Sequence, residues 1–291
     1  MIPPLFLSLP GKSETAKHIV FMSGDEEYRS EECLSQLARV MSKHHGFKCT
    51  VLYSVAPDGT IDPGVANNIP GMEQLKTADL LICMLRFRNL PDSQMAYFDD
   101  YVKSGKPIIG LRTATHAFKI PAGAKYHSYS WENQGGFGKQ ILGETWIAHH
   151  GDHLVESTRA IPRADHPILR GITNVWVPSD VYTVGKIDGT VLLDGQVLRG
   201  MSPTDPPLEG AKNNPMMPLA WLRTSPKVFT TTMGSGLDFL NEDLRRLIIN
   251  ASYWLLGREV PKRARADVVG KYEPSPIGFG KHLTGKRPGD F

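Results

Sequence analysis

The first residues that could perform chemistry form an acidic segment directly after an apolar run. Residues 18–24 (HIVFMSG) are apolar and end in glycine, which predicts a buried strand. Asp25, Glu26, Glu27 and Tyr28 come next. A carboxylate at a strand end can act as a general base or accept hydrogen bonds from hydroxyl groups. We therefore expect Glu26 and Glu27 to be catalytic and Asp25 and Tyr28 to bind substrate; the alternative is that the segment only begins a helix.

A second polar cluster, RTATH, follows another apolar run at residues 106–112. A sharp turn between a strand and a helix presents the nucleophile in α/β-hydrolases, and Arg112 occupies that position here. Arginine cannot attack a carbonyl, but its guanidinium can hold a carboxylate or sugar oxygens. We expect Arg112, Thr113 and Thr115 to bind substrate and His116 to act as acid or base. The alternative is a structural turn with an exposed histidine.

The third cluster is HHGDH, in which His149, His150, Asp152 and His153 could bind a metal. His149 and His153 would share one face only in a helix, and Gly151 argues against a helix there. We therefore predict no metal, a catalytic His149 and a substrate-binding His150. A metal-dependent hydrolase built on the four polar side chains remains an alternative.

Asp180 and Tyr182 follow another strand-like run, and we expect both to line the same cleft. Trp131, Trp146 and Trp221 can stack on a sugar ring, although aromatic residues more often belong to the core.

Alternating elements must position these clusters. The pattern predicts strands at 18–24, 47–55, 78–85 and 106–112, with helices from Ser30 to Gly46 and from Asp92 to Gly105. This order predicts a parallel sheet with helices on both faces over the first ~115 residues. Ligands bind at the carboxyl ends of such strands, so the clusters near 26, 112 and 149 should meet in one pocket. Short runs between 153 and about 232 predict added hairpins, and 242–256 predicts a final helix.

Composition excludes several classes of protein. The chain has 291 residues, of which 41% are hydrophobic and 22% charged, as in a globular protein. A net charge of +3 is too small for a nucleic-acid-binding protein. No apolar run is long enough to span a membrane. Three cysteines without a C-x-x-C pair predict neither disulfides nor a cysteine metal site.

The two ends of the chain differ in character. The N-terminal MIPPLFLSLPGK is apolar, but its prolines and the lack of a basic n-region make it a poor signal peptide. The compartment, cytoplasmic or exported, stays open. Residues 258–291 contain eight Lys/Arg against four Asp/Glu, which predicts an extended basic C-terminal tail. A homo-oligomer is compatible with this pattern, and nothing in the sequence sets the number of subunits.

Several ordered segments resemble the ThuA-like proteins, the trehalose-utilisation family. They are HIVFMSGDEEYR, KPIIGLRTATHAF, ILGETWIAHHG, DHPILRGI, SDVY and KVFTTTMGS. The resemblance covers residues 17–257, which we expect to form one domain. It implies a class I glutamine amidotransferase-like fold, that is, a flavodoxin-like three-layer α/β sandwich with a mostly parallel sheet, to which the β-hairpins are added.

The resemblance also implies site residues. Amidotransferases of this fold have a cysteine at the turn where this chain has Arg112, so Cys-dependent glutamine hydrolysis is not expected. ThuA-like proteins usually read G-L-H-S-A-T-D there; Arg112 replaces the histidine and His116 the aspartate. His149 matches a family histidine, and Asp180 and Tyr182 match the D-E-x-Y motif. Ser235 follows Met233-Gly234, where the family has L-G-H, and we expect it to contact substrate.

Together these features predict an enzyme that acts on trehalose, another disaccharide or a modified sugar. The chemistry would be acid–base catalysis of the hydrolase or isomerase/lyase type, without a cofactor. The expected partner is a small carbohydrate, with no nucleic acid and no membrane. The alternative is a non-catalytic sugar-binding or scaffold protein on the same fold.

Overall fold

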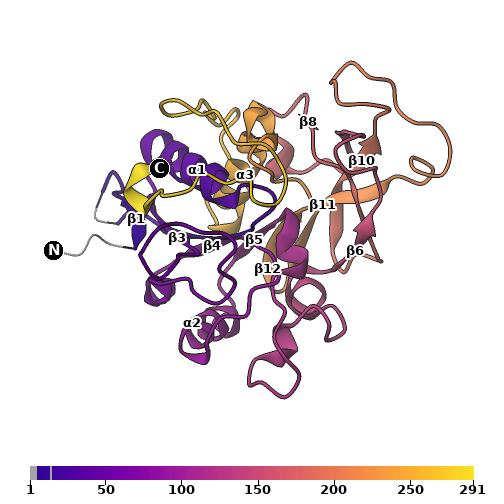
Figure 1. Ribbon diagram of the computed structural model, residues 1–291. Helices are drawn as coiled ribbons and strands as arrows, with labels where there is room; N and C mark the ends of the chain where they lie inside the picture. Colours follow the sequence, from indigo (N-terminus) through magenta and orange to yellow (C-terminus); the bar gives the residue numbers. More distant parts are fainter. Residues whose placement is uncertain (1–4, 14) are drawn as a thin grey trace.

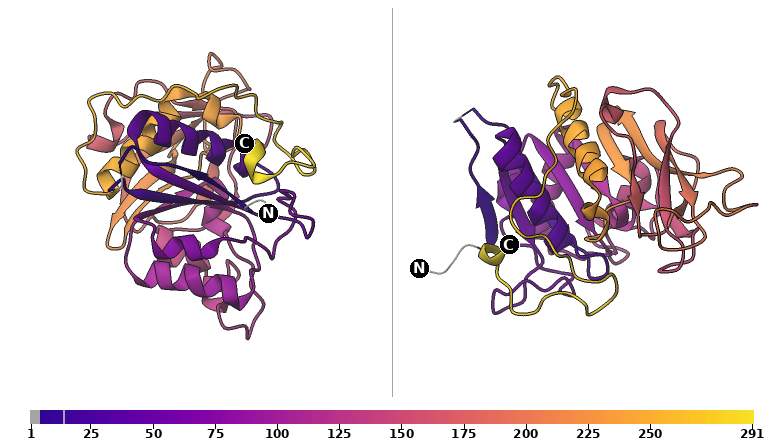
Figure 2. Two further views of the ribbon diagram at one scale, coloured as in Figure 1. Left: turned by 90° about the vertical axis from the view of Figure 1, so that its left-hand side faces the viewer. Right: turned by 90° about the horizontal axis from the view of Figure 1, so that it is seen from above.

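A ten-stranded sheet runs through the centre of the molecule and carries helices on both faces (Figure 1). The structure is a computed structural model that describes residues 5–13 and 15–291. Helices α1 (Ser30–His45) and α3 (Glu242–Leu255) cover one face of the sheet, and α2 (Asp92–Lys103) covers the other (Figure 2). The predicted three-layer α/β fold is therefore confirmed. Residues 1–4, where the apolar N-terminal segment begins, lie outside the described residues.

The sheet has a parallel part and an antiparallel part. Its strand order is β1-β3-β2-β4-β5-β12-β11-β10-β7-β8. The strands β3, β2, β4, β5 and β12 are mutually parallel, β1 pairs antiparallel with β3, and the strands from β11 onward are antiparallel. Their bounds are β1 Phe6–Leu9, β2 His18–Gly24, β3 Lys48–Tyr53, β4 Leu80–Leu85, β5 Ile108–Leu111, β7 Thr158–Pro162, β8 Trp176–Val177, β10 Thr190–Val197, β11 Met217–Thr224 and β12 Lys227–Thr231.

The parallel part follows from its apolar runs. Every residue of β2 and β4 is buried, because helices cover both faces of the sheet. Helix α1 ends at Gly46, whose φ of 73° is the left-handed conformation that glycine adopts at low cost. Helix α3 begins after Asn241, whose side-chain oxygen accepts a hydrogen bond from the Leu244 N–H at 2.9 Å. These boundaries agree with the sequence pattern to within a few residues.

The antiparallel part departs from the prediction in detail. Residues 153–158, the first of the short runs that we expected to form hairpins, lie mostly in the turn before β7. A separate two-stranded sheet forms from β6 (Trp146–His149) and β9 (Tyr182–Val184), and its register places His149 opposite Tyr182. The N-terminal strand β1 was not predicted. The short helices are η1 Met72–Lys76, η2 Arg112–His116, η3 His127–Tyr129, η4 Gly138–Leu142, η5 Pro167–Leu169, η6 Asp238–Leu240 and η7 Pro288–Asp290.

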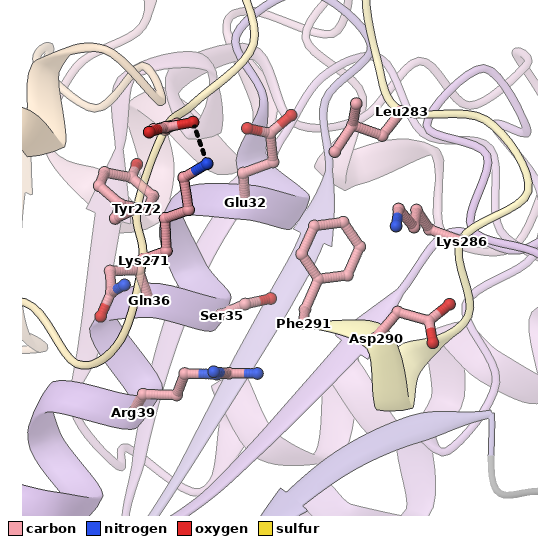
Figure 3. A pocket seen from close by; sticks show the side chains of 11 residues that line it. Glu32, Ser35, Gln36, Arg39, Lys271, Tyr272, Leu283, Lys286, Asp290 and Phe291 are labelled. Carbon is pink, nitrogen blue, oxygen red and sulfur yellow. Dashed lines mark ion pairs between the residues drawn. The ribbon is translucent and has the colours of Figure 1, made fainter.

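Residues 258–291, here called the C-terminal segment, run across α1 (Figure 2). Gln36 of α1 exchanges hydrogen bonds with the backbone of Val269, and Glu32 accepts one from the Ser275 N–H at 2.8 Å. Between α1 and this segment lies a cavity of about 450 Å³, toward which Arg39 and Phe291 extend (Figure 3). Within the described part of the chain, no helix has the length and apolar character that a membrane span requires.

Candidate active site at the carboxyl edge of the sheet

Four polar segments follow the parallel strands and lie at one edge of the sheet. Asp25–Tyr28 follow β2, Arg86–Arg88 follow β4, Arg112–His116 follow β5, and Thr232–Ser235 follow β12. The separate β6–β9 pair adds His149 at the end of β6 and Asp180 two residues before β9. Side chains far apart in the sequence thus come into contact at this edge.

Asp180 is the centre of the cluster. Its buried carboxylate accepts a hydrogen bond from Arg112 Nη2 at 2.9 Å and contacts Nδ1 of His149 at 2.7 Å and Nδ1 of His153 at 3.0 Å. Burial alone would raise the pKa of Asp180, but Arg112 and the two histidines outweigh it and hold the pKa well below its usual value. An ionised carboxylate only accepts hydrogen bonds, so each imidazole donates through Nδ1–H.

Arg112 is fully buried and points inward at Asp180. Its φ of 41° is left-handed, as a sharp turn after a strand requires. The guanidinium lies between two aromatic rings, 4.0 Å from the Tyr28 centroid and 4.3 Å from the Tyr182 centroid. It also donates to the carbonyls of Asp180 and Thr232 at 3.1 and 2.9 Å. We predicted that Arg112 binds substrate, whereas in the structure its guanidinium is enclosed and positions Asp180.

Glu27 extends the cluster on the other side of His153. Its carboxylate lies 3.5 Å from His153 Nε2 and 3.3 Å from Arg86 Nε. Burial raises the pKa of Glu27, and Arg86 opposes this effect only in part. A continuous series of contacts between titratable side chains therefore runs from Glu27 through His153 and Asp180 to His149.

Glu26 is held differently from its neighbour. Its two carboxylate oxygens pair with Arg86 at 2.5 Å and with Arg88 at 2.6 Å. Arg88 is itself buried and also donates to the carbonyl of Pro63 at 2.8 Å. Both oxygens of Glu26 are therefore engaged by arginine.

Four further predicted binding residues are buried beneath the cluster. Asp25 accepts hydrogen bonds from the N–H groups of Glu27 and Tyr28 at 2.7 and 2.8 Å and from the Thr113 hydroxyl. Thr115 donates to the Arg112 carbonyl at 3.0 Å. Ser235 and Asp238 exchange hydrogen bonds between their backbone N–H groups and side chains. Asp238 also accepts a hydrogen bond from the hydroxyl of Ser179, the residue before Asp180. These side chains support the turns that carry the cluster.

His116 is enclosed by aromatic side chains. Its ring centroid lies 4.9 Å from those of Phe87 and Trp146 and 6.1 Å from that of Tyr182. Burial lowers the pKa of His116 well below its usual value, and the nearby Arg86 adds to this effect. The alternative of an exposed His116 is therefore wrong. The three candidate tryptophans are also placed: Trp131 and Trp146 are half-buried side by side, and Trp221 belongs to the core.

The polar side chains of the HHGDH segment point in two different directions. His149 is exposed in 37% of its side chain, and His153 lies beside it with ring centroids 5.1 Å apart. His150 instead contacts the Lys212 carbonyl at 2.8 Å, and Asp152 pairs with Lys212 at 3.0 Å. The four-residue metal set of the alternative hypothesis is therefore not assembled. His149, His153 and Asp180 form a different group, with one donor atom from each lying within 4.8 Å of the others.

Sequence reasoning gave His153 a role only in the metal-binding alternative and assigned no role to Arg86 or Arg88. The two arginines follow β4 directly, so the rule that located the other clusters at strand ends also applies to them. His153 lies four residues after His149, and only the fold of the intervening turn shows that both face Asp180.

The comparison with protein families decides the classification. The family profile described as "ThuA: Trehalose utilisation" matches residues 18–255. The chain belongs to the ThuA family. A search of curated protein sequences found no significant match. The family assignment agrees with the resemblance of the ordered segments, and the site of this ThuA protein lies inside the matched region.

Solved structures agree with this assignment at the level of the fold. A protein described as ThuA-like from Bacteroides uniformis is 16% identical, with a TM-score of 0.52, and the match covers 84% of this chain and 94% of that one. A second, from Parabacteroides merdae, is 11% identical, with a TM-score of 0.54 and coverages of 85% and 93%. Alpha-L-fucosidase isoenzyme 2 from Paenibacillus thiaminolyticus, 11% identical with a TM-score of 0.52, matches 88% of this ThuA protein over only 34% of its own length.

Proposed function

We propose that this ThuA protein is an enzyme that acts on a small carbohydrate by acid–base chemistry, with His149 as the group that exchanges a proton with substrate. The observation that carries the proposal is the contact of 2.7 Å between His149 Nδ1 and the buried Asp180 carboxylate. Asp180 fixes the tautomer and orientation of the ring, so Nε2 is the atom that is free to accept or donate a proton. The partial exposure of the His149 side chain lets a substrate reach it.

The remaining members of the cluster have supporting roles. Arg112 keeps Asp180 ionised, and the Tyr28 and Tyr182 rings keep the guanidinium in place. His153 and Glu27 form a second proton-exchanging pair on the far side of the same carboxylate. Two such groups on either side of one carboxylate suit a reaction in which one group takes a proton and another returns one. The carbohydrate substrate is supported by the trehalose-utilisation description of the family.

The test is a turnover assay on purified protein with trehalose and a panel of small disaccharides and modified sugars, with products followed by NMR. His149→Gln should lower turnover by at least about 100-fold, a typical contribution of a positioned acid–base group. His44→Gln, on the exposed end of α1, is the matched control and should retain wild-type turnover. Wild-type turnover in His149→Gln would remove His149 from the mechanism. Absence of turnover on every sugar would favour the non-catalytic alternative.

A second candidate function is metal-assisted catalysis, which the closeness of His149, His153 and Asp180 favours. Two imidazoles and a carboxylate form a donor set that binds Zn²⁺ in enzymes. Against it stands Arg112, whose cationic group lies 2.9 Å from the same carboxylate and repels a second cation. Metal analysis of protein purified without a histidine tag, with turnover measured before and after chelation, separates the two. Activity that survives complete chelation leaves acid–base catalysis by the side chains.

A further inference from the structure

The C-terminal segment returns to the candidate active site at Gly278. The Gly278 N–H donates a hydrogen bond to the Glu27 carbonyl at 2.8 Å, and its carbonyl accepts one from Arg29 Nη2 at 2.9 Å. The φ of Gly278 is 129°, a conformation that suits glycine and lets the chain turn here. With both backbone groups engaged, the position of the next residue, Phe279, is set by the segment that carries Glu27.

Phe279 is an exposed aromatic residue beside charged groups of the site. The residue is 58% exposed, and its ring centroid lies 5.0 Å from the Arg86 guanidinium. The Phe87 ring contacts the same guanidinium at 4.9 Å. Arg86 in turn pairs with Glu26 and Glu27. An open aromatic face therefore adjoins a carboxylate and a guanidinium that already belong to the cluster.

This combination has the chemistry that a sugar ring requires. The C–H face of a pyranose is apolar and packs against an aromatic ring, while its hydroxyls form hydrogen bonds to carboxylates and guanidinium groups. Single exposed apolar side chains are common on protein surfaces and usually mean little. Phe279 differs because its backbone neighbour is hydrogen-bonded to Glu27, whose side chain contacts His153.

We propose that Phe279 is a stacking platform for one ring of the small carbohydrate, supplied to the active site by the C-terminal segment. This inference rests on the proposed function and adds a specificity-determining residue to it. It also gives the C-terminal segment a role in substrate binding.

The experiment measures trehalose binding by titration calorimetry and ligand-observed NMR in the full-length protein. Phe279→Ala should weaken binding about tenfold, which corresponds to about 1.4 kcal/mol. Phe279→Trp should restore affinity to within about twofold of wild type, because a larger aromatic face stacks at least as well. Leu283→Ala is the matched control, since it also truncates an exposed apolar residue of the C-terminal segment but lines the separate cavity beside α1. Its affinity should equal that of wild type.

Each failure has its own signature. Equal trehalose affinity in wild type and Phe279→Ala, with His149→Gln still inactive, overturns the platform and leaves the proposed function standing. Weaker binding in Leu283→Ala instead places the sugar in the cavity beside α1. If wild type binds neither trehalose nor the other sugars of the panel, the proposed function and the platform fail together. Thermal midpoints of the Ala variants should match wild type, so a change in affinity reports the lost ring face.

Discussion

Two carboxylates at the same edge of the sheet are surrounded by different cations. Glu26 pairs with two arginines, Arg86 and Arg88. Asp180 pairs with one arginine, Arg112, and with two histidines. The guanidinium group keeps its proton at any pH a protein tolerates, whereas an imidazole exchanges its proton near neutrality.

The difference separates a structural cluster from one that can move a proton. Around Glu26, no partner can release a proton, so its two ion pairs hold the segments after β2 and β4 together. Around Asp180, the arginine keeps the carboxylate charged, and the proposed function assigns proton exchange with a ligand to the histidines. We infer that the sequence-based expectation for Glu26 as a catalytic group is weaker than that for His149.

The largest expected effect comes from removing the charge of Asp180. Asp180→Asn leaves the fully buried Arg112 without its counter-charge, and loss of one partner of a buried pair typically costs about 3–5 kcal/mol of unfolding free energy. Glu26→Gln should cost less, about 1 kcal/mol, because Glu26 and Arg86 are 22% and 20% exposed and the buried Arg88 keeps its hydrogen bonds to backbone carbonyls. Urea unfolding at pH 7 measures both.

Equal losses of unfolding free energy in Asp180→Asn and Glu26→Gln would contradict the difference we infer between the two carboxylates. The double variant Arg112→Met/Asp180→Asn checks the cause, because it removes the uncompensated charge as well. We expect it to be more stable than Asp180→Asn alone.

Glu26 and Glu27 allow a second test, now on turnover. Glu27→Gln should lower turnover of the sugar substrate about tenfold or more, because Glu27 contacts His153. Glu26→Gln should have a smaller effect, about threefold, through the shared partner Arg86. Since burial raises the pKa of Glu27, its carboxylate takes up a proton at a higher pH than an exposed glutamate. The acidic limb of the wild-type pH–rate profile should therefore shift or vanish in Glu27→Gln.

A loss in Glu26→Gln as large as that in Glu27→Gln would restore Glu26 as a catalytic residue. The assay is the same NMR measurement of product, carried out between pH 4.5 and 8.

The parallel half of the molecule could be predicted because its signals are local. Each of β2, β4 and β5 is an apolar run, and the caps at Gly46 and Asn241 are set by residues next to them. The pairing of β6 with β9 has no such signal. Its strands are four and three residues long and more than thirty residues apart, so only tertiary contacts define their register.

The candidate site, too, could be predicted from the sequence only in part. The positions of Arg112, His149 and Asp180 at strand ends could be inferred from sequence, but the direction of each side chain could not. Arg112 points inward because rings from two other segments, Tyr28 and Tyr182, enclose its guanidinium. His116 was expected to serve as acid or base, and its enclosure depends on aromatic residues from three separate loops and strands.

His116 provides a further prediction, which concerns the pH dependence of stability. Its pKa is lowered in the folded state, so below pH 6.5 the unfolded chain binds a proton that the folded chain does not. The unfolding free energy should therefore fall as the pH falls, by at most about 1.4 kcal/mol per pH unit for this group. His18 acts in the same direction, since burial lowers its pKa to about 4.

The variant His116→Phe isolates the contribution of His116. Between pH 7 and pH 5, its unfolding free energy in urea should decrease less than that of wild type, by up to about 2 kcal/mol. His18→Gln removes the contribution of His18 and serves as the parallel control. Its unfolding free energy should also decrease less than that of wild type, over the window from pH 6.5 to 4. If His116→Phe keeps the full wild-type slope, His116 takes up its proton within the folded protein. It would then exchange protons as His149 is proposed to do, and the distinction between an enclosed histidine and one oriented by a carboxylate would no longer identify the catalytic group.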